Sequence, residues 1–263
     1  MARAKRHYIP GYVWHITHRC HKKEFLLKFA RDKRRWLHWL FEAKKRYGLV
    51  ILDYMVTSNH IHLLVVDDGD RESIPKSLQL VAGRTAQEYN QRKDRLGAFW
   101  QDRYHATAVE TDEHLHQCIA YIDLNMVRAG VVDHPSKWPF CGYNEIQNPR
   151  ERYGLINYNR LLNLVGIYSY DDFKVAHRNW AEASLVQGEN ARDSSWTEAV
   201  AVGSKKFVEK VKERLMVKVR GRHVCRNRDG YELRESIKPY SADFGGKKSA
   251  LRPENAYFWD NTF

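Results

Sequence analysis

Cysteine is scarce and dispersed in this sequence. Its four copies stand far apart and include no CxxC pair, at Cys20, Cys118, Cys141 and Cys225. Small disulfide-stapled domains and cysteine-rich zinc modules need closely spaced cysteines, so the pattern argues against both. No apolar run approaches the length of a transmembrane helix, and the basic N-terminus leads into no signal-peptide core. We therefore expect a soluble, cytoplasmic protein.

Acidic residues are also in deficit. The 263 residues include 32 Asp and Glu against 44 Lys and Arg, which gives a formal net charge of +12. The imbalance is uneven, with 14 basic and three acidic residues between positions 1 and 50, and ten and two between 205 and 228. A merely solvated surface normally mixes both signs, so this distribution favours a polyanionic partner, most often nucleic acid.

The first half of the chain alternates strand and helix patterns. Apolar spacing of three to four and a closing Gly48 predict a helix over residues 30–47. The other predicted segments are strands at 12–19, 49–56, 60–66 and 104–110 and helices at 73–95 and 112–129. The order β-α-β-β-α-β followed by a helix is the ferredoxin-like pattern, an α+β fold with an antiparallel sheet and helices on one face.

The residue pattern of the sequence changes beyond Gly130. Prolines punctuate a loop whose Trp138 and Phe140 we expect to pack back onto the first domain. Helical patterns follow at 158–187 and 202–215, separated by a polar stretch. We expect a first domain over 1–150 and a mostly helical, basic extension over 151–263, with a DNA-binding or regulatory role. The basic stretch 205–228 could clamp DNA or simply be a solvated helix and turn.

The most informative local feature is the pair His60 and His62. Residues two apart on a strand point to the same face, so the two imidazoles make half of a divalent-metal site. Tyr121 and Asn125 lie four apart and share one face of the predicted helix. Two imidazoles and an amide oxygen suit Mg²⁺ or Mn²⁺ with positions left for water or phosphate. Taken singly, the histidines could be ordinary sheet residues and Tyr121 a core-edge aromatic; together they indicate a site in which Tyr121 attacks a metal-polarised phosphate.

At this point the sequence resembles a known family. SNHIHLLV at 58–65 resembles the His-hydrophobic-His (HUH) strand of single-tyrosine transposases. YIDLNMVRAG at 121–130 resembles the tyrosine helix of their REP-associated branch, as do FWQDRYH at 99–105 and WPF at 138–140. The resemblance spans about residues 5–145. Met126 departs from it, because the branch usually has proline there.

The resemblance implies a transposase-like endonuclease that nicks and rejoins single-stranded DNA. Tyr121 would attack a phosphodiester, form a 5′-phosphotyrosine and release a 3′-OH. His60 and His62 would bind Mg²⁺ or Mn²⁺, with Asn125 as third ligand. The implied partner is single-stranded or hairpin DNA of repetitive extragenic palindromes, in a prokaryotic, nucleoid-associated protein. The branch favours a monomer, and a dimer stays open.

Several residues, most of them in the basic N-terminal region, have side chains that can stack on bases or bind phosphates. The DNA-binding candidates are Lys5, Arg6, Tyr8, Trp14, His15, Arg19, Lys22, Arg84 and Arg103. Trp14 could equally belong to the core, whereas His105, His114 and His116 are expected at structural or surface positions. Two other functions remain open: a non-catalytic, domesticated hairpin-binding regulator, and another HUH enzyme such as a plasmid relaxase or replication initiator.

Overall fold

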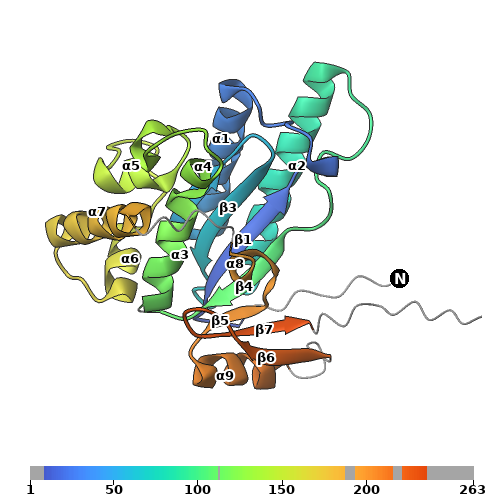
Figure 1. The fold of residues 1–263 in the computed structure, drawn as a ribbon. Coiled ribbons are helices and arrows are strands. Elements are labelled where there is room, and N and C mark those ends of the chain that lie inside the picture. Colours follow the sequence, from blue (N-terminus) through green and yellow to red (C-terminus); the bar gives the residue numbers. More distant parts are fainter. Residues whose placement is uncertain (1–8, 112, 187–192, 216–220, 236–263) are drawn as a thin grey trace, which may run out of the picture.

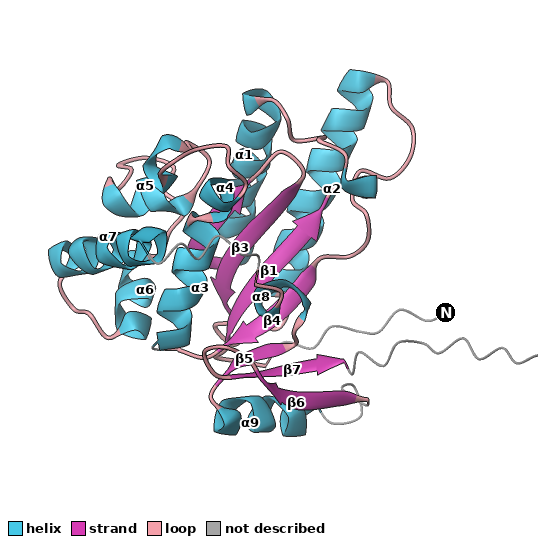
Figure 2. Ribbon diagram, in the orientation of Figure 1, coloured by secondary structure: helices cyan, strands magenta, loops and turns pink. Residues whose placement is uncertain are grey.

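A central sheet with helices on both faces forms the molecule (Figure 1; Figure 2). The structure is a computed structural model that describes residues 9–111, 113–186, 193–215 and 221–235. Its first six long elements are β1 (Val13–Arg19), α1 (Ala30–Tyr47), β2 (Val50–Val56), β3 (His60–Val66), α2 (Ser73–Lys93) and β4 (His105–Val109). Their order confirms the predicted β-α-β-β-α-β core of an α+β protein, and their bounds lie within two residues of the predicted ones.

The sheet continues beyond this core into the C-terminal part of the chain. Its strand order is β2-β3-β1-β4-β5-β7-β6, where the added strands are β5 (Ala201–Gly203), β6 (Arg222–Arg226) and β7 (Tyr231–Glu235). All neighbouring pairs are antiparallel except β4 and β5. The division into two domains at residue 150 stays a prediction. Strands from before and after this residue belong to one sheet.

The predicted helix over 202–215 is wrong at its start. Val202 lies in β5, where it pairs with Val109 of β4 and with Glu232 of β7. The helix α9 (Lys205–Leu215) begins only after Ser204, whose hydroxyl accepts a hydrogen bond from the backbone N–H of Phe207 at 3.2 Å. A serine that satisfies an unpaired N–H of the first turn is a typical helix N-cap, so the helix starts there.

The two faces of the sheet carry different helices. In Figure 1, α1 and α2 lie behind the sheet, and α3 (Glu113–Asp123), α4 (Asn125–Arg128) and α8 (Ser195–Glu198) lie in front of it. The registers place His62 opposite Thr17 and Thr17 opposite His105 on neighbouring strands, so these three side chains share the front face. None of the described helices is both long and apolar enough to cross a membrane.

The remaining helices of the front layer pack beside α3. They are α5 (Gly142–Gln147), α6 (Tyr158–Val165) and α7 (Tyr170–Val186), and short 3₁₀ turns occur at His21–Lys23 and Pro135–Lys137. The loop before α5 returns to the sheet, because the Trp138 indole donates to the Val56 carbonyl at 3.0 Å and the Val56 N–H donates to the Phe140 carbonyl at 2.9 Å. This confirms the prediction that Trp138 and Phe140 pack the loop onto the first domain.

Gly142 holds α5 against β2 at a distance that no other residue allows. A Cβ atom at this position would lie 2.0 Å from Asp53 Oδ1 and 3.1 Å from the backbone nitrogen of Tyr54. Asp53 is fully buried, and Oδ1 accepts a 2.7 Å hydrogen bond from that nitrogen, so it cannot swing away. We expect Gly142→Ala to lower the free energy of unfolding by about 3 kcal/mol, in the range typical of overpacked sites.

Chemical denaturation of the purified variant measures this change. Gly83→Ala is the matched control, because Gly83 lies in α2 and a Cβ atom there meets nothing within 4 Å. Alanine is the better helix former, so the control should leave stability unchanged or raise it by up to about 1 kcal/mol. Equal stability of the Gly142→Ala variant and the parent would contradict the close approach of α5 and β2.

Candidate active site

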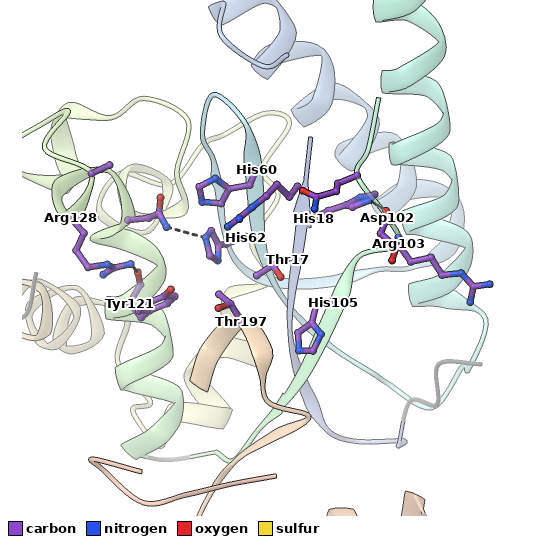
Figure 3. A pocket seen from close by; sticks show the side chains of 14 residues that line it. Thr17, His18, His60, His62, Asp102, Arg103, His105, Tyr121, Arg128 and Thr197 are labelled. Atoms are coloured by element: carbon purple, nitrogen blue, oxygen red, sulfur yellow. Dashed lines mark hydrogen bonds between the residues drawn. The ribbon is translucent and has the colours of Figure 1, made fainter. Parts of the chain in front are cut away.

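A cleft of about 440 Å³ opens between the front face of the sheet and the α3–α4 junction. Figure 3 shows that the histidines of β3 and the tyrosine of α3 face each other across it. Strands β1, β3 and β4, the segment after Phe99, the α3–α4 junction and α8 all contribute lining side chains. The lining residues are Thr17, His18, Arg19, His60, His62, Gln101, Asp102, Arg103, His105, Tyr121, Asn125, Arg128, Ala129 and Thr197.

The two histidines of β3 occupy the floor of the cleft. Their ring centroids are 5.0 Å apart, as expected for residues two apart on one strand face. The Thr57 hydroxyl donates its hydrogen to the His60 carbonyl at 2.8 Å. The Thr57 oxygen therefore acts as an acceptor toward the His60 imidazole. Nδ1 of His60 lies 2.9 Å from that oxygen and 2.7 Å from Asn59 Oδ1. Two acceptors at Nδ1 place a proton there, so in the neutral ring the lone pair is on Nε2.

His62 lies deeper than His60 and is only 2% exposed. Burial, followed by the nearby imidazoles of His60 and His15, holds the pKa of His62 well below its ordinary value. The ring is therefore neutral at physiological pH, which is the form that binds metals. Its Nε2 lies 3.0 Å from Asn125 Nδ2, the contact drawn as a dashed line in Figure 3.

Tyr121 and Asn125 come from the junction of two helices rather than from one continuous helix. The predicted helix over 112–129 is interrupted at Leu124, where α3 ends and α4 begins. The guanidinium of Arg128 donates to the Tyr121 carbonyl at this break and lies over the Tyr121 ring, 4.1 Å from its centroid. Despite the interruption, Tyr121 and Asn125 lie on the same side of the two helices, since both line the cleft.

Tyr121 stands against the buried histidines. The residue is 9% exposed, and its ring centroid lies 5.9 Å from that of His62 and 6.2 Å from that of His15, edge to face in both cases. Two residues along α3, Asp123 binds His177 of α7, with 2.7 Å between Oδ2 and Nε2. Burial raises the pKa of Asp123 and lowers that of His177 to about 3, so it disfavours the charged form of each group, and the hydrogen bond between them anchors α3 to α7.

The residues present fit a hard divalent cation with an incomplete protein shell. In the described ranges, no three His, Cys, Asp or Glu side chains lie close enough together to hold a metal ion. The donors on offer are therefore the Nε2 atoms of His60 and His62 and the amide of Asn125. Asn125 presents its nitrogen to His62, so ligation would require its oxygen on that side. Such a set leaves positions for water or phosphate oxygen, as Mg²⁺ and Mn²⁺ sites commonly do.

The rim of the cleft is predominantly basic. Arg19, Arg103 and Arg128 line it with the imidazoles, against the single carboxylate of Asp102. Guanidinium groups bind phosphate oxygens in a bidentate manner, so this rim suits a phosphodiester. Arg128, Thr17, Thr197 and His105 were not expected in the site. The signals for Arg128 and His105 were their places in the motifs YIDLNMVRAG and FWQDRYH, whereas Thr17 and Thr197 depend on strand pairing and on the packing of distant segments.

The structure corrects part of the DNA-binding list. Trp14 is 2% exposed and lies on the rear face of β1, so its ring packs in the core and cannot stack on a base. His15 is fully buried beneath His62. Arg84 is exposed on α2, behind the sheet, where its guanidinium lies 4.8 Å from the Trp39 ring centroid, and its DNA-binding role stays a prediction. Lys22 is exposed in the turn after β1 and stays a prediction. Lys5, Arg6 and Tyr8 lie outside the described residues.

Comparison with known proteins finds similarity to transposases. Residues 9–125 match the model of a family described as "Transposase IS200 like". No curated protein matches the sequence. One similar solved structure is that of the REP-associated tyrosine transposase bound to a REP hairpin, with 20% identity, a TM-score of 0.48 and coverage of 65% of this chain and 90% of that chain.

A second similar structure is a putative transposase from Deinococcus radiodurans R1. It has 16% identity and a TM-score of 0.33, and the match covers 44% of this chain and 90% of that chain. The family match spans β1–β4 and α3 and ends at Asn125, so it includes both histidines of β3 and the tyrosine that faces them. Residues 9–125 of this chain are therefore similar to IS200-like transposases.

Proposed function

We propose that this protein is a metal-dependent endonuclease and strand transferase that nicks and rejoins single-stranded DNA beside palindromic hairpins, as a member of the REP-associated branch. The observation that carries the proposal is the meeting of His60 and His62 with Tyr121 and Asn125 in one cleft with a basic rim. A hydroxyl nucleophile, two imidazoles and guanidinium groups are the parts that phosphoryl transfer requires.

The reaction is a transesterification at phosphorus. Tyr121 Oη forms a bond to the phosphorus atom, and the bond from phosphorus to O3′ of the neighbouring nucleotide breaks. The phenol loses its proton and the departing O3′ gains one, so no water or nucleotide triphosphate is consumed. Attack of a 3′-OH on the 5′-phosphotyrosine reverses the step and rejoins a strand.

Each side chain has a distinct part in this step. A divalent ion held by His60, His62 and Asn125 would polarise the phosphate and stabilise its developing charge. Arg128 holds Tyr121 through its carbonyl and the face of its ring, which limits the directions the phenol can take. Arg19 and Arg103 at the rim would bind the phosphates that flank the scissile one. Tight packing of Tyr121 against His62 keeps nucleophile and metal site adjacent.

Incubation with a labelled single-stranded hairpin tests the proposal. With Mg²⁺ or Mn²⁺, the protein should form a covalent adduct that survives denaturation, migrates with the label and disappears on protease digestion. Removal of the metal with EDTA should abolish the adduct and leave hairpin binding largely intact, because binding rests on the basic surface. Hairpin binding without any adduct, across several metals and hairpin sequences, would favour the non-catalytic regulator.

A further inference from the structure

His15 and His62 form a hydrogen-bonded pair beneath the floor of the cleft. Nε2 of His15 lies 2.9 Å from Nδ1 of His62, and the two rings are within 10° of parallel with centroids 5.0 Å apart. That separation places the rings edge to edge, so the hydrogen bond lies close to the ring planes. On its other side, Nδ1 of His15 lies 2.8 Å from the carbonyl oxygen of Trp196, at α8. A continuous chain of hydrogen bonds thus runs from α8 to the site.

The Trp196 carbonyl determines the direction of every hydrogen bond in this series. A carbonyl oxygen only accepts, so Nδ1 of His15 carries the proton that it donates to Trp196. In a neutral imidazole the other nitrogen then has the lone pair, and Nε2 of His15 accepts from Nδ1–H of His62. The lone pair of His62 is consequently on Nε2, which lies 3.0 Å from Asn125 in the cleft.

We propose that His15 is a positioning residue for the metal ligand His62, and that the Trp196 carbonyl sets the tautomers of both rings, which makes the C-terminal segment around α8 part of the active site. The inference deepens the proposed function and rests on it. It replaces the DNA-binding role predicted for His15, which complete burial excludes. Ligands held by such hydrogen bonds keep the orientation and the tautomer that a metal requires.

The segment that supplies the carbonyl is itself held by the sheet. Thr107 of β4 donates to the Ala199 carbonyl at 2.7 Å, and His105 Nε2 lies 2.8 Å from the same oxygen. The Val200 carbonyl accepts from the Ala108 N–H at 2.8 Å, immediately before β5. Thr197, between the carbonyl and these anchors, lines the cleft. The C-terminal extension therefore contacts the site through a backbone carbonyl, which no sequence motif marks.

Nitrogen-15 spectra of the histidine side chains test the inference on the metal-free full-length protein. Long-range ¹H–¹⁵N correlations distinguish a protonated from an unprotonated ring nitrogen, and comparison with a His62→Ala sample assigns the ring. In the parent, we expect His62 to be protonated at Nδ1 and to carry its lone pair on Nε2. A parent His62 that is protonated at Nε2 would overturn the inference without any variant at position 15.

Two variants at position 15 and one control separate the relay from general packing. His15→Leu removes the acceptor and should shift His62 toward the Nε2–H tautomer and weaken Mn²⁺ binding about 10- to 100-fold. His15→Gln keeps one donor and one acceptor and should recover most of the affinity. Thr107→Val keeps the side-chain shape but removes hydrogen bonds to the Ala199 carbonyl at 2.7 Å and to the Trp196 carbonyl at 3.4 Å. The Trp196 carbonyl still accepts from His15 in this variant, so the His62 tautomer should stay unchanged.

The outcomes also separate this inference from the proposed function. A parent that shows the expected tautomer but binds no Mn²⁺ refutes the metal site and leaves the hydrogen-bond chain in place. A parent that binds Mn²⁺ and forms the adduct, with His15→Leu unchanged in tautomer and affinity, refutes the relay alone. If His15→Leu does not fold, the parent spectrum and the Mn²⁺ affinity of His15→Gln decide between the alternatives. A Mn²⁺ affinity of His15→Gln as low as that of the metal-site variant His60→Ala counts against the relay.

Discussion

Tyr121→Phe should eliminate the covalent protein–DNA adduct and lower the nicking rate by at least about 10³-fold. The phenolic oxygen is the only atom removed, and it is the atom that forms the bond to phosphorus. A nucleophile cannot be replaced by binding interactions elsewhere in the site, so its loss removes the covalent route. A 10³-fold loss corresponds to about 4 kcal/mol of transition-state stabilisation. Adduct yield on a denaturing gel and single-turnover nicking rates measure both effects.

Structure and DNA binding should survive this substitution. The aromatic ring keeps its contacts with His15, His62 and Arg128, so the cleft keeps its shape. Tyr143→Phe is the matched control, because Tyr143 of α5 is also buried, at 3% exposure, and packs on His177 outside the cleft. The control should form adduct at the parental rate. Adduct or cleavage at the same rate from Tyr121→Phe would refute the assignment of the nucleophile.

The parts of the site that the sequence predicts are those whose geometry is local. His60 and His62 share a strand face because strand side chains alternate, whatever the rest of the fold does. Tyr121 and Asn125 are four residues apart, which brings them to one side even though Leu124 interrupts the helix. The three-to-four apolar spacing of the helices and the apolar, β-favouring runs of the strands also predict the βαββαβ order.

The parts that the sequence does not predict depend on pairing between distant segments. Trp14 and His15 differ in environment only because the register of β1 against β3 and β4 turns one ring to the rear layer and the other beneath His62. The role of His15 depends on a partner 181 residues further along the chain. β5 has only three residues, too few for alternation to be detected, and gains its structure from pairing on both sides.

His60→Ala should weaken Mn²⁺ binding by at least about 100-fold, because it removes one of two imidazole ligands from a site with few protein donors. Adduct formation should fall with metal occupancy, whereas hairpin binding in EDTA should stay within a few-fold of the parent. His60 is the sharper choice of the two histidines. His62 is buried between His15 and Asn125, so its removal would leave buried polar atoms without partners and confuse loss of metal with loss of folding.

A histidine of similar exposure elsewhere provides the control for His60→Ala. His134 is half-buried and hydrogen-bonded to Ser136 at 2.7 Å, but it lies outside the cleft. Both substitutions should cost about 1 kcal/mol of folding free energy through their lost hydrogen bonds, so stability alone cannot separate them. Only His60→Ala should lose Mn²⁺ affinity, measured by titration calorimetry or by the spectrum of bound Mn²⁺. Unchanged Mn²⁺ affinity in His60→Ala would place the metal elsewhere and leave Tyr121 without the cation that its attack on phosphate requires.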